Sequence, residues 1–194
     1  MGNPGRRYAE TRHNAGFHLV DRIAREAGAA WMEKPGRAEA IVPIGGRDTV
    51  LVKPLAYMNR SGPPVLACLE EHRLDAGQLL VAVDDVALPA GRLRLRAAGS
   101  SGGHRGLASI EQALATDRYA RLRLGVGGAE PGEDLAEYVL RPLSPEEREE
   151  FDRMIERGAE AVRVALLEGF PAAMNRFNPS PPSNGENGSQ GREG

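Results

Sequence analysis

Apolar positions recur along this chain with two different periods, and each period predicts a kind of element. After Asn14, apolar side chains follow at helical spacing, and Gly28 is placed to end that helix. Two short apolar runs, 40–44 and 49–54, flank a Gly-Gly turn and predict a β-hairpin. The residues that share the helical face are Phe17, Val20, Ile23, Ala24 and Ala27.

Three later segments have the pattern of strands. Residues 79–84 form a continuous apolar run that ends at Asp84, as in a buried strand. In 91–96 and 121–127, leucines alternate with arginines, which predicts strands with one core face and one half-exposed arginine face. The arginines of that face are Arg92, Arg94, Arg96, Arg121 and Arg123.

Helix start signals separate these strands. Ser61, followed by two prolines, is expected to cap a helix that runs to Glu71, and 106–115 has a second helical pattern. Residues 144–147 form a Ser-Pro-Glu-Glu capping box that opens a long helix to about Glu168. Strands and helices therefore alternate, which predicts a single α/β domain with a mixed sheet.

The last part of the chain has a different composition. Residues 178–194 contain no aliphatic or aromatic side chain, so they cannot bury enough surface to offset the entropy of ordering. We expect a folded domain over 1–177 and a disordered polar tail over 178–194.

Composition restricts the cellular setting. No apolar run approaches the roughly 20 residues needed to cross a bilayer, and the N-terminus lacks the apolar core of a secretion signal. The single cysteine, Cys68, cannot form an internal disulfide. These features predict a protein of the reducing cytoplasm, without a membrane partner.

Charge is distributed unevenly. The net charge of −2 excludes a globally basic nucleic-acid binder, but residues 92–123 hold seven arginines against two acidic residues. Residues 133–160 hold ten acidic residues against four arginines. One part of the surface could attract phosphate, although solvated faces without a partner would have the same composition.

The search for a general base starts from four histidines, because imidazole titrates near neutrality. His18 and His72 lie inside predicted helices, where structural roles are expected. His13 precedes a helix, and His104 lies in a glycine-rich loop; such loops often carry functional sites. Asp84, at the carboxyl end of a buried strand, could hold an imidazole. The alternatives for Asp84 and its neighbour Asp85 are a turn or a Mg²⁺ site.

Asparagines complete the set of polar candidates. Asn3, Asn14 and Asn59 lie in loop-like contexts, where amides can read a peptide bond or donate to an oxyanion, or can simply form turns and caps. Tyr57 and Met58 could provide an apolar wall. The chain has no phosphate-binding loop and no zinc-type Cys or His pairs, so we predict no nucleotide cofactor and no zinc. No serine lies in a Gly-x-Ser-x-Gly turn, so water is the expected attacking group.

Seven segments occur in a set order along the chain: GNPG at 2–5, Tyr8, TRHNAGF at 11–17, KPLAYMNRSG at 53–62, VDDVALPAG at 83–91, GGHRGL at 102–107 and RLRLGVG at 121–127. Read together, they resemble the bacterial-type peptidyl-tRNA hydrolases over about residues 2–177. The resemblance implies a three-layer α/β/α domain that cleaves the ester between a peptide and the 3′ ribose of tRNA, without metal or cofactor. The expected partner is the acceptor stem and 3′ end of peptidyl-tRNA, and the expected state is a monomer.

The resemblance also implies the roles of individual residues. His13 would activate water, and Asp84 would keep the His13 imidazole basic. Asn3 would distinguish a blocked peptidyl amine from a free one. Asn59, with Tyr57 and Met58, would clamp the substrate near the ester. The residues implied near the tRNA end are Tyr8, Gly102, His104 and Arg105.

Three departures from the family pattern stand out. Arg105 replaces an asparagine, and Ala87 replaces an aspartate of a turn. The family's first strand, which precedes the GNPG motif, is not seen here. If it is missing, Asn3 would lie on a frayed terminus, and we expect an upstream apolar strand to raise stability and activity.

Two other functions are compatible with the residues. One is a non-catalytic RNA- or partner-binding protein on the same scaffold, since fold does not determine function. The other is hydrolysis of a different small ester or amide, which needs only a pocket and a base.

Overall fold

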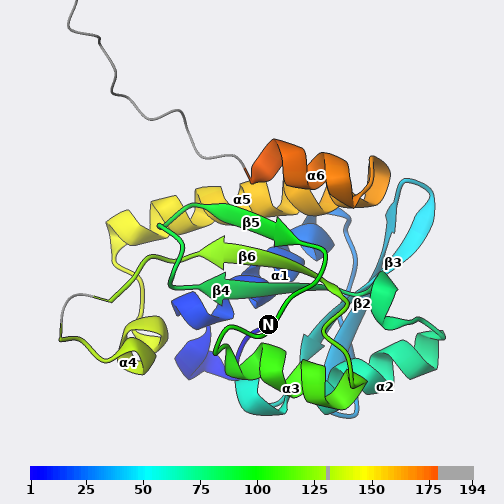
Figure 1. Ribbon diagram of the computed structural model, residues 1–194, viewed down its shortest axis with the longest axis horizontal. Helices are drawn as coiled ribbons and strands as arrows, with labels where there is room; N and C mark the ends of the chain where they lie inside the picture. Colours follow the sequence, from blue (N-terminus) through cyan, green and yellow to red (C-terminus); the bar gives the residue numbers. More distant parts are fainter. Residues whose placement is uncertain (130–131, 179–194) are drawn as a thin grey trace, which may run out of the picture.

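The computed structural model describes residues 1–129 and 132–178 of the chain. Helices and strands alternate, as expected for the α/β class (Figure 1). The strands are β1 (Met32–Lys34), β2 (Arg37–Ile44), β3 (Arg47–Pro54), β4 (Leu80–Asp85), β5 (Leu93–Arg96) and β6 (Ala120–Gly125). The α-helices are α1 (Ala15–Glu26), α2 (Gly62–His72), α3 (Arg105–Leu114), α4 (Leu135–Leu140), α5 (Pro145–Leu167) and α6 (Phe170–Phe177).

The strands form two three-stranded sheets. The first has the order β1-β2-β3 and is antiparallel, and it contains the predicted hairpin, with Ala40 opposite Leu51. The second has the order β4-β6-β5, with β4 parallel and β5 antiparallel to β6. The expected mixed pairing is therefore confirmed. An apolar cavity of about 150 Å³ lies between β3 and β4, lined by residues that include Val50, Val52, Val81 and Ala82.

Two hydrophobic cores cover the two faces of the strands, which gives the three layers. The larger core packs side chains such as Leu95, Leu122 and Leu124 against α1, α5 and α6. The smaller core packs Val81 and Val83 of β4 against α2 and α3. Complete burial of each aliphatic side chain contributes about 1.5–3 kcal/mol. Over the described residues, no helix combines the length and the apolar composition needed to span a membrane.

The capping predictions had mixed outcomes. Ser144 and Glu147 form the expected capping box at the start of α5. Ser61 does precede α2, but its hydroxyl donates to the carbonyl of Met58 (2.9 Å) and does not accept from the helix. The prediction of a Ser61 side-chain cap is therefore wrong, because the hydroxyl closes the preceding turn, η3 (Met58–Arg60).

The folded part extends one residue beyond the expected boundary. The side chain of Asn178 bonds to both backbone groups of Leu95 in β5, accepting from N (2.7 Å) and donating to O (3.1 Å). Asn178 thus satisfies part of an open strand edge, so its assignment to a disordered tail is wrong. The remainder of the predicted tail, 179–194, lies outside the described residues.

Candidate active site

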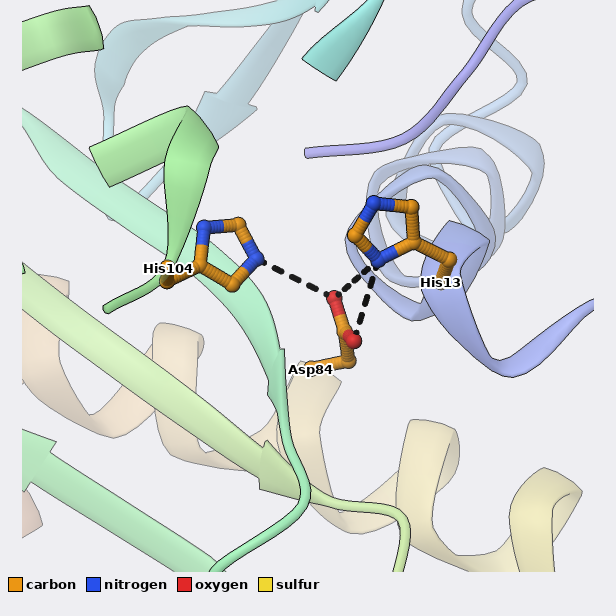
Figure 2. A group of neighbouring side chains, drawn as sticks. All are labelled: His13, Asp84 and His104. Atoms are coloured by element: carbon orange, nitrogen blue, oxygen red, sulfur yellow. Dashed lines mark hydrogen bonds and ion pairs between the residues drawn. The ribbon is translucent and has the colours of Figure 1, made fainter. Parts of the chain in front are cut away.

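His13 and Asp84 meet at the carboxyl end of β4. His13 lies in a short turn, η2 (Arg12–Asn14), directly before α1, and its Nδ1 is 3.1 Å from both Oδ1 and Oδ2 of Asp84 (Figure 2). The Asp84 side chain is buried, whereas that of His13 is 16% exposed. The pairing expected from the sequence is thus present, with the imidazole at the accessible end.

A glycine allows this pairing. Gly16 lies in the first turn of α1, and a Cβ at this position would collide with the backbone oxygen of Ala82 in β4. The helix can approach the strand only because residue 16 has no side chain. The turn that carries His13 is therefore held over the end of β4.

His104 brings a second imidazole to the same carboxylate. Its Nε2 lies 3.3 Å from Oδ1 of Asp84, and the rings of His13 and His104 are 5.8 Å apart (Figure 2). Gly102 and Gly103 precede it with φ of 58° and 84°, a region that favours glycine. The sequence indicates a substrate loop for His104 but does not predict its contact with Asp84.

The two imidazoles determine the charge state of Asp84. Burial by itself raises the pKa of this carboxyl group. Hydrogen bonds from His104 and His13 outweigh that effect and hold the pKa of Asp84 well below its usual range. Asp84 is therefore an anion at neutral pH, as an imidazole-orienting carboxylate must be.

Three hydrogen bonds, two to the Asn14 side chain and one to the backbone of Met58, fix the orientation of Asn3. The backbone N of Asn3 donates to Oδ1 of Asn14 (2.8 Å), and Nδ2 of Asn14 donates to the Asn3 carbonyl (3.0 Å). Oδ1 of Asn3 accepts from the backbone N of Met58 (2.8 Å). Asn3 is buried and held by these bonds, so it does not lie on a frayed terminus.

Nine of the ten residues to which the family resemblance gives a site role line one cavity of about 710 Å³. Tyr8, in the turn η1 (Arg6–Tyr8), is the exception and is not part of the lining. The nine are Asn3, His13, Tyr57, Met58, Asn59, Asp84, Gly102, His104 and Arg105. His18 and His72 lie outside the cavity and bond to Ala9 O and Glu39, as expected for structural histidines.

The opposite wall of the cavity was missed in the sequence. It is formed by the short helix α4, whose apolar lining residues are Leu135, Ala136, Val139 and Leu140. Asp134 caps α4 by accepting from the backbone N of Ala136 and Glu137. The Asp-x-x-Glu spacing at 134–137 before apolar residues was the available signal for this helix.

The arginine face is only partly accessible. Arg94 and Arg96 are exposed, as expected, but Arg121 is 1% exposed because its guanidinium bonds to carbonyl groups that include Ser100 O (3.0 Å) and Asp117 O (3.0 Å). The prediction that Arg121 belongs to a half-exposed face is therefore wrong. Arg123 pairs with Asp85 (3.1 Å).

The neighbouring turn is intact despite the alanine at position 87. Oδ1 of Asp85 accepts from the backbone N of Ala87 (2.9 Å), which supplies a side-chain bond within the turn. The side chain of Asp85 thus serves this turn and Arg123 together.

Two groups of side chains in the described part have potential metal ligands within 4.8 Å of one another: His13, Asp84 and His104, and Glu39, Cys68 and His72. In the first group, both oxygens of Asp84 already accept hydrogen bonds. In the second, Glu39 pairs with Lys34 (2.8 Å) and Arg37 (2.5 Å). A metal ion would have to displace these bonds in either group.

Comparison with known proteins gives one consistent result. A family model described as peptidyl-tRNA hydrolase matches residues 1–186. Proteins named peptidyl-tRNA hydrolase from Synechococcus sp. (strain JA-2-3B'a(2-13)) and Gloeobacter violaceus are 46% and 44% identical, over 92% of this chain and 81% and 91% of theirs. The crystal structure of peptidyl-tRNA hydrolase from Acinetobacter baumannii superposes with a TM-score of 0.85 at 33% identity, covering 91% of each chain.

Proposed function

This chain belongs to the peptidyl-tRNA hydrolase family, and we propose that it cleaves the ester of peptidyl-tRNA with His13 as the general base and water as the nucleophile. The observation that carries this mechanism is the bond between Nδ1 of His13 and Asp84. It leaves Nε2 of His13, which points away from Asp84 in Figure 2, to accept a proton.

The reaction then needs no group beyond the side chains and water. Nε2 of His13 takes a proton from water as the water oxygen attacks the ester carbonyl carbon. The imidazolium is stabilised by the Asp84 anion. When the tetrahedral intermediate collapses, the bond to the ribose 3′ oxygen breaks and that oxygen receives the proton, giving a free peptide carboxylic acid and a 3′ hydroxyl. Positioned base catalysis of this kind contributes about 10²–10⁴ in rate.

Asn3 is suited to recognise the blocked amine of the substrate. Its Oδ1 is occupied by the backbone N of Met58, so its Nδ2 is the group that remains to meet the substrate. An N–H donor pairs with the carbonyl that blocks a peptidyl amine. It has nothing to offer a free ammonium, which is itself only a donor. Asn3 can thereby favour peptidyl-tRNA over aminoacyl-tRNA.

The apolar walls are suited to the peptide part. Leu135 of α4 is 48% exposed and Tyr57 is 62% exposed, and both line the cavity together with the buried Met58. The strength of an apolar contact with a peptide depends on the apolar area that is buried and not on the order of the peptide's residues. We propose that Asn59 clamps the substrate near the ester between these walls.

Exposed arginines in and near the cavity are suited to the tRNA. Arg105 is exposed at the start of α3 and lines the cavity mouth, and Arg94 and Arg96 are exposed on β5. Guanidinium groups bind phosphate in a bidentate manner. We propose that they contact the acceptor stem, with Tyr8 and Gly102 nearer the 3′ end. The protein would act as a monomer in the cytoplasm, where translation supplies the substrate.

The test is release of peptide from an N-blocked aminoacyl-tRNA by the purified chain. We expect cleavage of the blocked substrate and little cleavage of the unblocked one. His13→Ala should reduce kcat by about 10²–10⁴, while His18→Ala, the matched control in α1, should retain it. Turnover by His13→Ala within a few-fold of wild type would identify a different base. No cleavage by a folded wild-type chain would favour the non-catalytic alternative.

A further inference from the structure

His104 makes a different kind of bond through each of its ring nitrogens. Its Nδ1 accepts from the backbone N of Gly106 (3.2 Å) and of Leu107 (3.2 Å), so the imidazole is the N-terminal cap of α3. A nitrogen that accepts hydrogen bonds carries no proton. The proton of the neutral imidazole must therefore be on Nε2.

The position of that proton determines what His104 does at Asp84. Nε2 lies 3.3 Å from Oδ1 of Asp84, and a carboxylate can only accept. The Nε2–H group thus donates to Oδ1, while Nδ1 of His13 lies 3.1 Å from both oxygens. The carboxylate is buried and is held from two sides.

We propose that His104 is a positioning residue: the first turn of α3 fixes its tautomer, and the resulting Nε2–H donor fixes the carboxylate that orients His13. The inference rests on the proposed role of His13 as the base. With both nitrogens engaged inside the protein, His104 has no free nitrogen with which to activate a water. Its effect on the reaction passes through Asp84.

Histidine is suited to this place because it offers an acceptor and a donor at opposite sides of one rigid ring. An asparagine at this position can reproduce only the acceptor, and a glutamine only the donor. The Oδ1 of an asparagine can replace Nδ1 as the helix cap, but the side chain is too short to reach Asp84. The amide of a glutamine can reach Asp84 as Nε2 does, but it leaves the cap unmade.

These two variants separate the two roles. We expect His104→Asn to keep the melting temperature within about 2 °C of wild type, because the cap remains. We expect it to lower kcat by about tenfold or more, the factor for one lost hydrogen bond to a charged group. KM should change less than kcat.

His104→Gln should show the opposite result. Its melting temperature should fall by about 2–4 °C, and its kcat should stay closer to wild type than that of His104→Asn. Ser144→Ala, which removes the cap of α5, is the control for a cap lost away from the site. If kcat followed the melting temperature across these variants, His104 would be only a cap and the inference would be overturned.

The tautomer can be measured without any substrate. The ¹⁵N resonances of the His104 imidazole in the full-length wild-type chain should show a protonated Nε2 and an unprotonated Nδ1. A proton on Nδ1 would overturn this inference and would leave the proposed function in place. No hydrolysis by a chain with the expected tautomer would instead overturn the proposed function.

Discussion

The guanidinium of Arg12 lies 4.3 Å from the centre of the Tyr138 ring, so the residue beside the proposed base is attached to the helix that forms the far wall of the cavity. Arg12 also donates to the carbonyls of Tyr138 and Arg141 at the end of α4 (3.4 Å each) and pairs with Glu147. Its side chain is 2% exposed. Arg12 thus links the turn that carries His13 to the cavity wall formed by α4.

Replacing Arg12 should therefore loosen the apolar wall. Arg12→Met keeps much of the side-chain volume but removes the donors to α4. We expect the free energy of unfolding to fall by about 2 kcal/mol and KM to rise more than kcat falls. Urea unfolding and steady-state kinetics measure the two effects, with Arg148→Met as a more exposed control. A normal KM in folded Arg12→Met would show that α4 is held by other contacts.

Asn3→Asp tests the recognition of the blocked amine. The substitution keeps the shape and the acceptor for Met58 N, but it replaces the proposed Nδ2 donor by an anion that attracts ammonium. We expect the ratio of kcat/KM for blocked over unblocked aminoacyl-tRNA to fall by about tenfold or more. Parallel assays of the two substrates give this ratio. An unchanged ratio would assign the discrimination to another group.

A buried carboxylate far from the site, Glu39, should contribute to the acid stability. Burial raises the pKa of Glu39, but its bonds to Lys34, Arg37 and His72 outweigh burial and lower the pKa to about 2. The unfolded state, with a pKa near 4.5, then binds more protons between these values, so stability is complete above about pH 4.5 and is lost as pH falls toward about 2.

This loss should amount to about 3 kcal/mol, measured by urea unfolding at several pH values. Asp84 contributes in the same direction, because its pKa is also lowered. Glu39→Gln should flatten the acid limb of the stability profile relative to wild type. An equally steep limb in that variant would assign the effect to other carboxylates.

The exposed arginines of β5 should set the salt dependence of tRNA binding. Arg94→Glu and Arg96→Glu are each expected to weaken binding and to reduce the slope of log Kd against log salt by about one. Arg123→Glu is a less direct test, because Arg123 pairs with Asp85. Arg153→Glu, on the acidic helix α5 with a side chain 66% exposed, is the matched control. Equal slopes for all variants would place the tRNA on another surface.

The sequence predicted the His13–Asp84 pair because each residue had a local signal: a turn before a helix, and the end of a buried strand. It did not predict that His104 would join them, because that contact depends on how α3 packs beside β4. The wall formed by α4 was missed because a six-residue helix has too few periodic positions to stand out.

The burial of Arg121 shows a second limit. Alternation along a strand identifies two faces, but it does not indicate which part of a face is covered by a loop. Here the segment 99–100 and the carbonyl of Asp117 surround the guanidinium, while Arg96, directly opposite on β5, stays exposed. The contact of Asn178 was not predicted either, because its partner Leu95 is 83 residues away in the sequence.

The absent side chain of Gly16 has a consequence for how this protein could be inactivated. A methyl group at this position would act as a wedge between α1 and the Ala82 carbonyl, and moving the helix outward would carry His13 away from Asp84. The distance between His13 and Asp84 thus depends on Gly16, a residue that takes no part in the chemistry. A single added carbon would be enough to separate the two partners while leaving each of them unaltered.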